Sequence, residues 1–91
     1  MNMKSFYAPS ELGHKIAANA RAIRKKRKIS QKRLSEMAGV SFGSIKRFEA
    51  SGEISLKSLL KIAIVLDCAE VFAELFAQAP LSIQEIIDGK L

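Results

Sequence analysis

A chain of 91 residues with 48% hydrophobic and 26% charged residues has room for one compact domain and is too short for a two-domain enzyme. Its formal net charge of +6 is unevenly divided. Residues 1–49 hold twelve Lys and Arg against three acidic residues, a net +9, whereas residues 50–91 hold three against six, a net −3. The N-terminal half is therefore expected to face a polyanion.

The residues that could support catalysis or metal binding are few. Cys68 is the single cysteine, which predicts a buried structural thiol in a reducing cytoplasm, and the isolated His14 predicts a structural or surface side chain. This set predicts no enzyme, no metal site and no cofactor. The most hydrophobic run, residues 59–66, is too short to cross a membrane and contains Lys61, and residues 1–7 lack an apolar signal core. We expect a cytoplasmic protein with no membrane partner.

The middle of the chain is expected to form consecutive short helices, because both prolines lie near the ends and no stretch alternates as a β-strand does. Ser10 is expected to cap a first helix that runs to about Lys26, with Glu11 in its first turn. Apolar residues recur at helical spacing along it: Ile16, Ala20 and Ile23.

Two further helices are expected on either side of a glycine. Ser30 would cap a helix over residues 31–38 that ends at Gly39, and Ser41 would cap a helix to about Ala50. Ser51 and Gly52 would stop it. The side chains expected to face inward are Leu34, Met37 and Ala38 on the earlier helix and Ile45 and Phe48 on the later one.

The C-terminal part is more apolar. Ser55 is expected to cap a helix over residues 56–66 that is apolar almost all round and must be covered on several sides. A further helix is expected from residue 69 to about 78, and the capping box of Ser82 and Glu85 predicts a last short one. The apolar residues aligned on these two helices are Val71, Phe72, Leu75, Phe76, Ile83, Ile86 and Ile87. This extension, about residues 69–88, is expected to need a partner surface.

The segment from Gln31 to Glu49 carries the most information, because it contains two short helices joined by a glycine turn. The positions that form its pattern are Gln31, Leu34, Gly39, Val40, Ser41, Ile45, Glu49 and Gly52. On these residues the chain strongly resembles the Xre and Cro family of phage-repressor-like helix-turn-helix regulators, over about residues 16–66.

The resemblance implies an all-α, five-helix lambda-repressor-like DNA-binding bundle, here with a short additional C-terminal helix. It would form a single domain over residues 1–91 with its helix-turn-helix core at about 31–50. The implied function is sequence-specific binding of double-stranded DNA in the major groove by a transcriptional regulator, in particular a repressor, without a cofactor. A homodimer is expected on two half-sites about 34 Å apart, with the apolar C-terminal extension either as its pairing surface or as the surface that binds another protein.

The resemblance also implies roles for individual residues. The base-reading face of the third helix would comprise Phe42, Gly43, Lys46 and Arg47. Phosphate contacts would come from Gln31, Ser41 and Ser44 and from the basic residues Lys25, Lys26, Arg27 and Lys32. Arg24 and Glu49 match a charge pair that ties the first helix to the end of the third, so Arg24 is assigned to structure rather than to DNA.

The sequence departs from the family at three positions. Ser35 stands where alanine is usual, and Phe42 and Gly43 stand where polar base-reading side chains are more common, so direct base readout is expected to be sparse. Phe42 either packs against a thymine methyl or is a core or dimer residue, and Gly43 would let the backbone approach the groove wall. The basic run at residues 24–28 either lies against phosphates or is a solvated helix end.

Two other functions are compatible with the sequence. The first is a protein-binding module, such as an antitoxin whose apolar C-terminal helices bind a toxin. The second is a helix-turn-helix fold that no longer binds DNA. The basic N-terminal half argues against the second of these.

Overall fold

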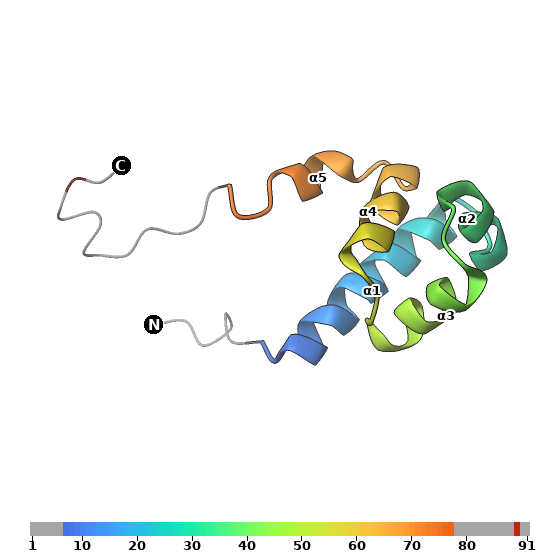
Figure 1. Ribbon diagram of the computed structural model, residues 1–91, viewed down its shortest axis with the longest axis horizontal. Coiled ribbons are helices and arrows are strands. Elements are labelled where there is room, and N and C mark those ends of the chain that lie inside the picture. The colour runs from blue at the N-terminus through green and yellow to red at the C-terminus, as the bar shows by residue number, and fades with distance from the viewer. Residues whose placement is uncertain (1–6, 78–88, 90–91) are drawn as a thin grey trace.

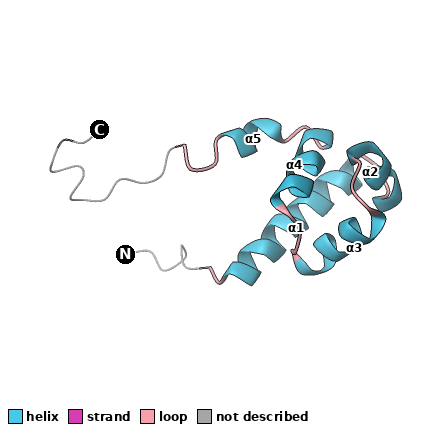
Figure 2. Ribbon diagram, in the orientation of Figure 1, coloured by secondary structure: helices cyan, strands magenta, loops and turns pink. Residues whose placement is uncertain are grey.

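The computed structural model describes residues 7–77 and 89, which form five helices joined by short loops, with no strand among them (Figures 1 and 2). The helices are α1 (Pro9–Lys26), α2 (Gln31–Ala38), α3 (Phe42–Ser51), α4 (Leu56–Val65) and α5 (Ala69–Ala73). The expected all-α bundle is thereby confirmed. The predicted last helix, with Ser82, Ile83, Glu85, Ile86 and Ile87, lies outside the described residues.

The helices pack in a simple order. α1 packs against α3, α2 packs against both α3 and α4, and α5 packs against α4. In Figure 1, α2 and α3 lie at one end of the molecule, whereas α5 and the first half of α1 point toward the other end. The two ends therefore expose different elements.

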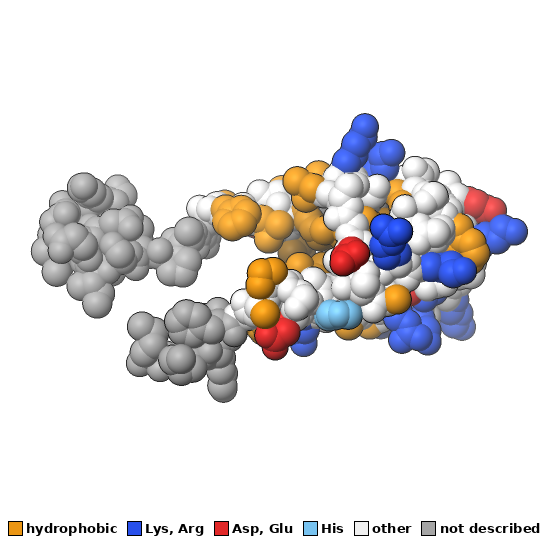
Figure 3. Space-filling view, turned by 60° about the horizontal axis from the view of Figure 1, so that its bottom comes forward, with side chains coloured by type: hydrophobic (Ala, Val, Ile, Leu, Met, Phe, Trp, Pro, Cys, Tyr) orange, Lys and Arg blue, Asp and Glu red, His pale blue; other side chains and the backbone are white. Residues whose placement is uncertain are grey.

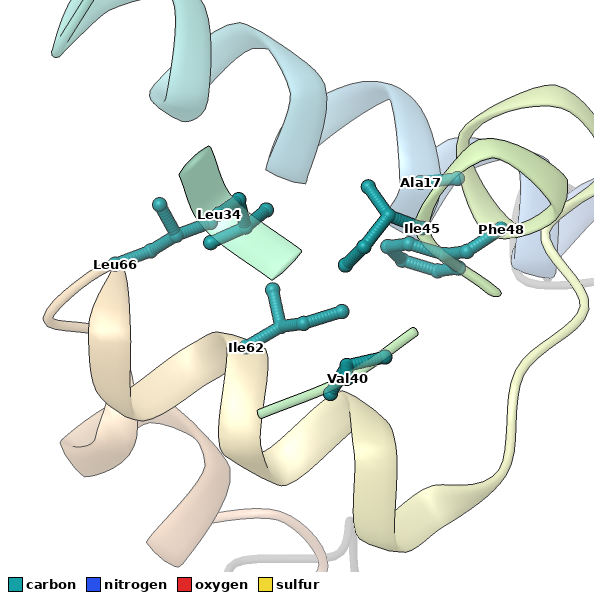
Figure 4. Close-up of a cluster of buried hydrophobic side chains, with 7 residues drawn as sticks. All are labelled: Ala17, Leu34, Val40, Ile45, Phe48, Ile62 and Leu66. Atoms are coloured by element: carbon teal, nitrogen blue, oxygen red, sulfur yellow. The ribbon is translucent and has the colours of Figure 1, made fainter. Parts of the chain in front are cut away.

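One hydrophobic core lies between α1, α2, α3 and α4 (Figure 4). Its buried side chains are Ala17, Leu34, Val40, Ile45, Phe48, Ile62 and Leu66. Each large side chain that is fully buried contributes about 1.5–3 kcal/mol to stability. α5 places no fully buried residue in this core, so its packing against α4 is peripheral to the core.

Three serines begin the helices that they were expected to cap. The hydroxyl oxygens of Ser30, Ser41 and Ser55 accept hydrogen bonds from backbone N–H groups three residues later, at 2.9, 3.1 and 3.1 Å. Gly39 and Gly52 end α2 and α3 with φ of 67° and 80°, in the left-handed region that favours glycine. The predicted boundaries of these helices are confirmed to within one residue.

The predicted cap of α1 is wrong. The helix begins at Pro9, and Glu11 accepts a hydrogen bond from the Ala8 N–H at 3.1 Å. Ser10 therefore lies inside the first turn. The reason is that proline has a φ already suited to the first helical position and lacks the N–H that would otherwise need a partner there.

Two expected inward faces also differ from the structure. On α1, Ala20 and Ile23 pack against the core as expected, but Ile16 is exposed and the buried residues are Ala17 and Arg24. On α2, Leu34 is buried and Ala38 packs on the core, but Met37 is exposed. Leu34 and Ala38 are four residues apart and therefore lie on the same side of α2. The contact of α2 with the core is narrow, so Met37 lies outside it.

α5 is shorter than predicted. It ends at Ala73, and residues 74–77 form turns in which Phe76 has a φ of 65°. Short helices are marginal unless an apolar face is packed. Val71, Leu75 and Phe76 are exposed, so this part of the chain lacks the contact that would extend the helix to residue 78.

Glycine is required where α1 crosses the end of α3. A Cβ atom built on Gly52 would lie 2.7 Å from both the Gly13 carbonyl oxygen and the His14 backbone nitrogen. A Cβ on Gly13 would lie 3.2 Å from the Gly52 carbonyl oxygen. The two helices therefore meet backbone to backbone, and this close approach sets where α3 ends.

Replacing Gly52 by Ala is expected to lower the free energy of unfolding by about 2–4 kcal/mol, because left-handed backbone strain and overpacking add together. Gly39→Ala is the matched control, since Gly39 has φ 67° but no atom within 4 Å of the position that an added methyl would occupy. Gly39→Ala should lower the free energy of unfolding only by the cost of the left-handed backbone strain, about 1–2 kcal/mol. Urea unfolding measures both, and equal losses would contradict the close approach.

Candidate nucleic-acid interface

The turn between α2 and α3 is closed by Ser35. Its hydroxyl donates to the Val40 carbonyl at 2.6 Å, and its own carbonyl accepts from the Gly39 and Val40 N–H groups at 3.0 and 3.2 Å. The turn is thus fixed by side chain and backbone together. Sequence reasoning noted Ser35 as a departure from the usual alanine but did not predict this bond, because nothing in the spacing shows that the chain returns to it.

α3 has two distinct faces. Ile45 and Phe48 are 0% and 2% exposed and anchor one face in the core. The opposite face exposes all the residues that were expected to read bases: Phe42, Gly43, Lys46 and Arg47. The Lys46 ammonium lies 5.0 Å from the centre of the Phe42 ring, a cation–π distance. Phe42 is therefore at the surface of this chain and not in its core.

The C-terminal end of α3 is tied to α1 by the predicted pair of Arg24 and Glu49. Arg24 donates from Nε and Nη2 to the two carboxylate oxygens at 2.7 and 2.8 Å, and from Nη1 to the Ile29 carbonyl at 2.8 Å. Gln31 Nε2 donates to the same carboxylate at 3.0 Å. The pair is confirmed, and it joins α1, the following loop, the start of α2 and α3.

The carboxylate of Glu49 is held in its charged form. Burial raises its pKa, but hydrogen bonds from Arg24 and Gln31 and the charges of Arg24 and Arg21 lower it further than burial raises it. The net result is a pKa below the ordinary 4.5. Glu49 is therefore ionised at neutral pH, and its two oxygens act as acceptors.

The residues expected to meet phosphates occupy varied positions. Ser41 donates its hydroxyl hydrogen to Ser44 Oγ at 2.7 Å, which leaves the Ser44 hydroxyl hydrogen outside that bond. Ser41 and the four basic members of the set, Lys25, Lys26, Arg27 and Lys32, are exposed. Arg27 also lies 3.9 Å from Asp67 in an exposed ion pair. Gln31 is half-buried and uses one N–H on Glu49, so its second amide hydrogen is outside that contact.

On the face shown in Figure 3, basic side chains and a hydrophobic hollow lie toward different ends. In Figure 3, Lys and Arg side chains gather toward the end that holds α2 and α3, whereas hydrophobic side chains border a hollow toward the α5 end. The base-reading residues predicted for α3 thus lie at the basic end.

Other kinds of site find little support in this part of the chain. Among residues 7–77 and 89, no group of three or more His, Cys, Asp or Glu side chains is arranged to hold a metal ion. No helix in the same range is both long and apolar enough to cross a membrane. His14 is exposed, and Cys68 is a half-buried free thiol packed against the core.

Arg24→Ala is expected to lower the free energy of unfolding by about 3–5 kcal/mol, because it leaves a buried carboxylate without its partner. The side chains of Arg24 and Glu49 are only 8% and 5% exposed. Arg21→Ala is the control, since Arg21 lies 3.8 Å from the same carboxylate with a half-exposed side chain. It should cost less than about 1 kcal/mol. Similar small losses in both variants would refute the structural role of Arg24.

The pair also predicts a pH dependence. Because the pKa of Glu49 is depressed in the folded state, its contribution is present above about pH 4.5 and is lost as pH falls through the folded pKa. Glu49→Gln removes this titration. The stability difference between the parent chain and Glu49→Gln, measured by urea unfolding, should therefore shrink on acidification, and a difference independent of pH would contradict the assignment.

Comparison with known proteins agrees with this geometry. A family model described as helix-turn-helix matches residues 21–72, from the second half of α1 into α5, which is more than half of the chain. No curated protein matches the sequence. The matched family consists of DNA-binding domains and not of enzymes. The chain therefore belongs to the Cro/C1-type, Xre-like helix-turn-helix family.

Proposed function

We propose that this chain binds double-stranded DNA sequence-specifically by placing α3 in the major groove, and that it acts in the cytoplasm as a transcriptional repressor. The observation that carries the proposal is the two-faced α3, anchored in the core by Ile45 and Phe48 and tied at its end by Glu49. A rigid helix about 10–12 Å in diameter fits a groove about 12 Å wide.

The exposed face of α3 offers three kinds of base contact. Arg47 and Lys46 are suited to the acceptors of guanine, and the Phe42 ring is suited to a thymine methyl. Gly43 has no side chain and would let the backbone of α3 approach the wall of the DNA groove. A Cβ at this position would meet nothing within 4 Å in the chain. Packing within the chain therefore does not require a glycine, although glycine inside a helix costs about 1 kcal/mol relative to alanine.

Backbone contacts are proposed for the surrounding polar and basic residues. The Ser44 hydroxyl and the second amide hydrogen of Gln31 would donate to phosphate oxygens, with Ser41 holding Ser44 in place. The cations in this proposal are Lys25, Lys26, Arg27 and Lys32. Since Arg27 already has Asp67 as an exposed neighbour, its phosphate contact would replace a weak ion pair.

A homodimer on a two-fold operator is also proposed, because one small recognition helix buries too little surface for typical specific affinity. The surface that supports pairing is a stripe on α4 formed by Leu56, Leu60 and Ile64, all exposed at four-residue spacing. DNA selected from a random pool should then contain two half-sites about 34 Å apart. Asymmetric selected DNA together with a monomer in sedimentation at micromolar concentration would contradict the dimer.

A different set of exposed apolar residues, at α5 and just after it, favours a second candidate function. An antitoxin-type module would use the apolar surface near Val71, Leu75 and Phe76 to bind another protein while α3 binds DNA. If the chain sediments as a dimer and this surface is buried between its two copies, the result would favour a repressor that binds no other protein.

Replacing a proposed base-reading residue should affect DNA binding differently from replacing a proposed phosphate-contacting residue. Arg47→Ala should weaken binding to the selected operator by about 1–3 kcal/mol and affect random DNA much less. Lys25→Ala should weaken both DNAs alike and reduce the salt slope by about 1. The control for loss of one positive charge is Lys15→Ala, an exposed residue in the first half of α1. Binding across a salt series measures all three variants, and equal weakening of both DNAs by Arg47→Ala would reassign Arg47 to the backbone.

Gly43→Ala should separate stability from DNA binding. The added methyl has open space in the chain, so the substitution should raise the free energy of unfolding by about 0.5–1 kcal/mol. If the backbone at Gly43 lies against the groove wall, operator binding should weaken by about 1–3 kcal/mol, the size of a lost base contact. Thermal unfolding and operator binding test the two effects, and unchanged binding would exclude a close approach at this residue.

A further inference from the structure

Phe42 and Lys46 form one unit on the exposed face of α3. The Lys46 ammonium lies over the Phe42 ring, 5.0 Å from its centre. Both side chains are exposed, and Phe42 is 43% exposed. At this distance the negative face of the ring attracts the cation. The two residues are four positions apart, so they are neighbours on the helix surface.

The other neighbours of Lys46 on α3, a helix that the structure describes in full, do not compete with this contact. Residues three and four positions away are neighbours on a helix, which for Lys46 are Phe42, Gly43, Glu49 and Ala50. Gly43 has no side chain, and Ala50 has only a methyl group. The Glu49 carboxylate is nearly buried and accepts hydrogen bonds from side chains of α1 and α2. The aromatic ring is therefore the group on α3 that holds the ammonium.

The contact directs the lysine side chain toward the start of α3. Phe42 is the first residue of this helix, and helical side chains point toward the N-terminus of their helix. A lysine side chain is flexible, and its ammonium has three hydrogens that can donate. Held on the ring, the ammonium presents the donors that do not face the ring from a fixed place.

A fixed ammonium makes lysine a more selective reader of bases. Lysine is a point charge that is also well suited to phosphates. When its cation is held at one place on a rigid helix, it can donate to the acceptors of one guanine, and less side-chain freedom is lost on binding. The ring can therefore contribute to base readout although it has no hydrogen-bond donor.

We propose that Phe42 is a positioning residue whose ring holds the Lys46 ammonium in place to contact a guanine in the major groove. The proposal rests on the proposed function and deepens it, since Lys46 reads the base and Phe42 acts through Lys46. The ammonium occupies one face of the ring. Contact of a thymine methyl with the ring is a separate, direct role, which a double-mutant cycle distinguishes from positioning.

The contact itself is measured without DNA. In NMR spectra of the full chain, the ring current of Phe42 should shift the side-chain methylene protons of Lys46 upfield of those of Lys57, an exposed lysine on α4. Phe42→Leu should abolish this difference, and Phe42→Tyr should keep it because tyrosine retains an aromatic face. Lys46 protons that match those of Lys57 in the parent chain would overturn the proposal.

The effect on DNA binding is measured by a double-mutant cycle of Phe42→Leu and Lys46→Ala on a DNA fragment selected from a random pool. Leucine keeps an apolar side chain that can contact a thymine methyl but lacks the aromatic face. Phe42→Leu should weaken binding about two- to fivefold, the size of a cation–π contact at an exposed site. It should have little effect once Lys46 is replaced by Ala, and Phe42→Tyr should bind as the parent chain does.

Arg47→Ala is the matched control for Lys46→Ala. Arg47 also carries a positive charge on α3, but it is five positions from Phe42 and is not its neighbour on the helix. In the Arg47→Ala chain, Phe42→Leu should therefore weaken binding by the same factor as in the parent chain.

Base replacement tests selectivity with the same proteins. Each guanine·cytosine pair of the fragment is replaced in turn, and the pair that Lys46 reads is the one whose replacement no longer weakens binding of Lys46→Ala. Phe42→Leu should reduce discrimination at that same pair. Circular dichroism checks that each variant folds, as expected for substitutions of two exposed side chains.

The outcomes separate this proposal from the proposed function. If the parent chain binds the fragment but Phe42→Leu weakens binding by the same factor with and without Lys46, the ring acts directly and the positioning role is overturned alone. If the parent chain binds no DNA from the pool, the proposed function is overturned together with the positioning role.

Discussion

The orientation of α3 depends on one buried interaction, the paired hydrogen bonds between Arg24 and Glu49. The desolvation of two buried charges offsets much of their attraction, so the effect of such a pair is mainly to fix geometry. Here it fixes the end of α3 against α1, and Gln31 joins the same carboxylate from the start of α2. The two helices that form the proposed DNA surface are thus positioned by one carboxylate.

A second constraint acts at the same end of α3 through backbone contact. Gly13 and Gly52 let α1 and the end of α3 approach more closely than side chains would permit. At the other end, the Ser35 hydroxyl closes the turn before α3. With both ends fixed and Ile45 and Phe48 buried, the exposed face of α3 projects as a rigid surface, which is what recognition in a DNA groove requires.

Local signals in the sequence predicted much of this fold. Ser30, Ser41 and Ser55 marked helix starts because a hydroxyl cap depends only on neighbouring backbone groups. The pair of Arg24 and Glu49 came from resemblance to a family, since its members lie twenty-five residues apart. Contacts without a local pattern were missed. The bond of Ser35 to Val40 and the approach of Gly13 to Gly52 depend on how helices meet in space, and the length of α5 depends on packing.

NMR titration of the full chain with a DNA fragment selected for binding measures whether the exposed face of α3 contacts DNA. The largest amide shifts are expected on Gly43, Ser44 and Arg47 and at the start of α2. Amides between α1, α4 and α5, such as that of Leu59, should shift little. Largest shifts on α4 and α5, with α3 unaffected, would show that α3 is not the DNA-binding surface.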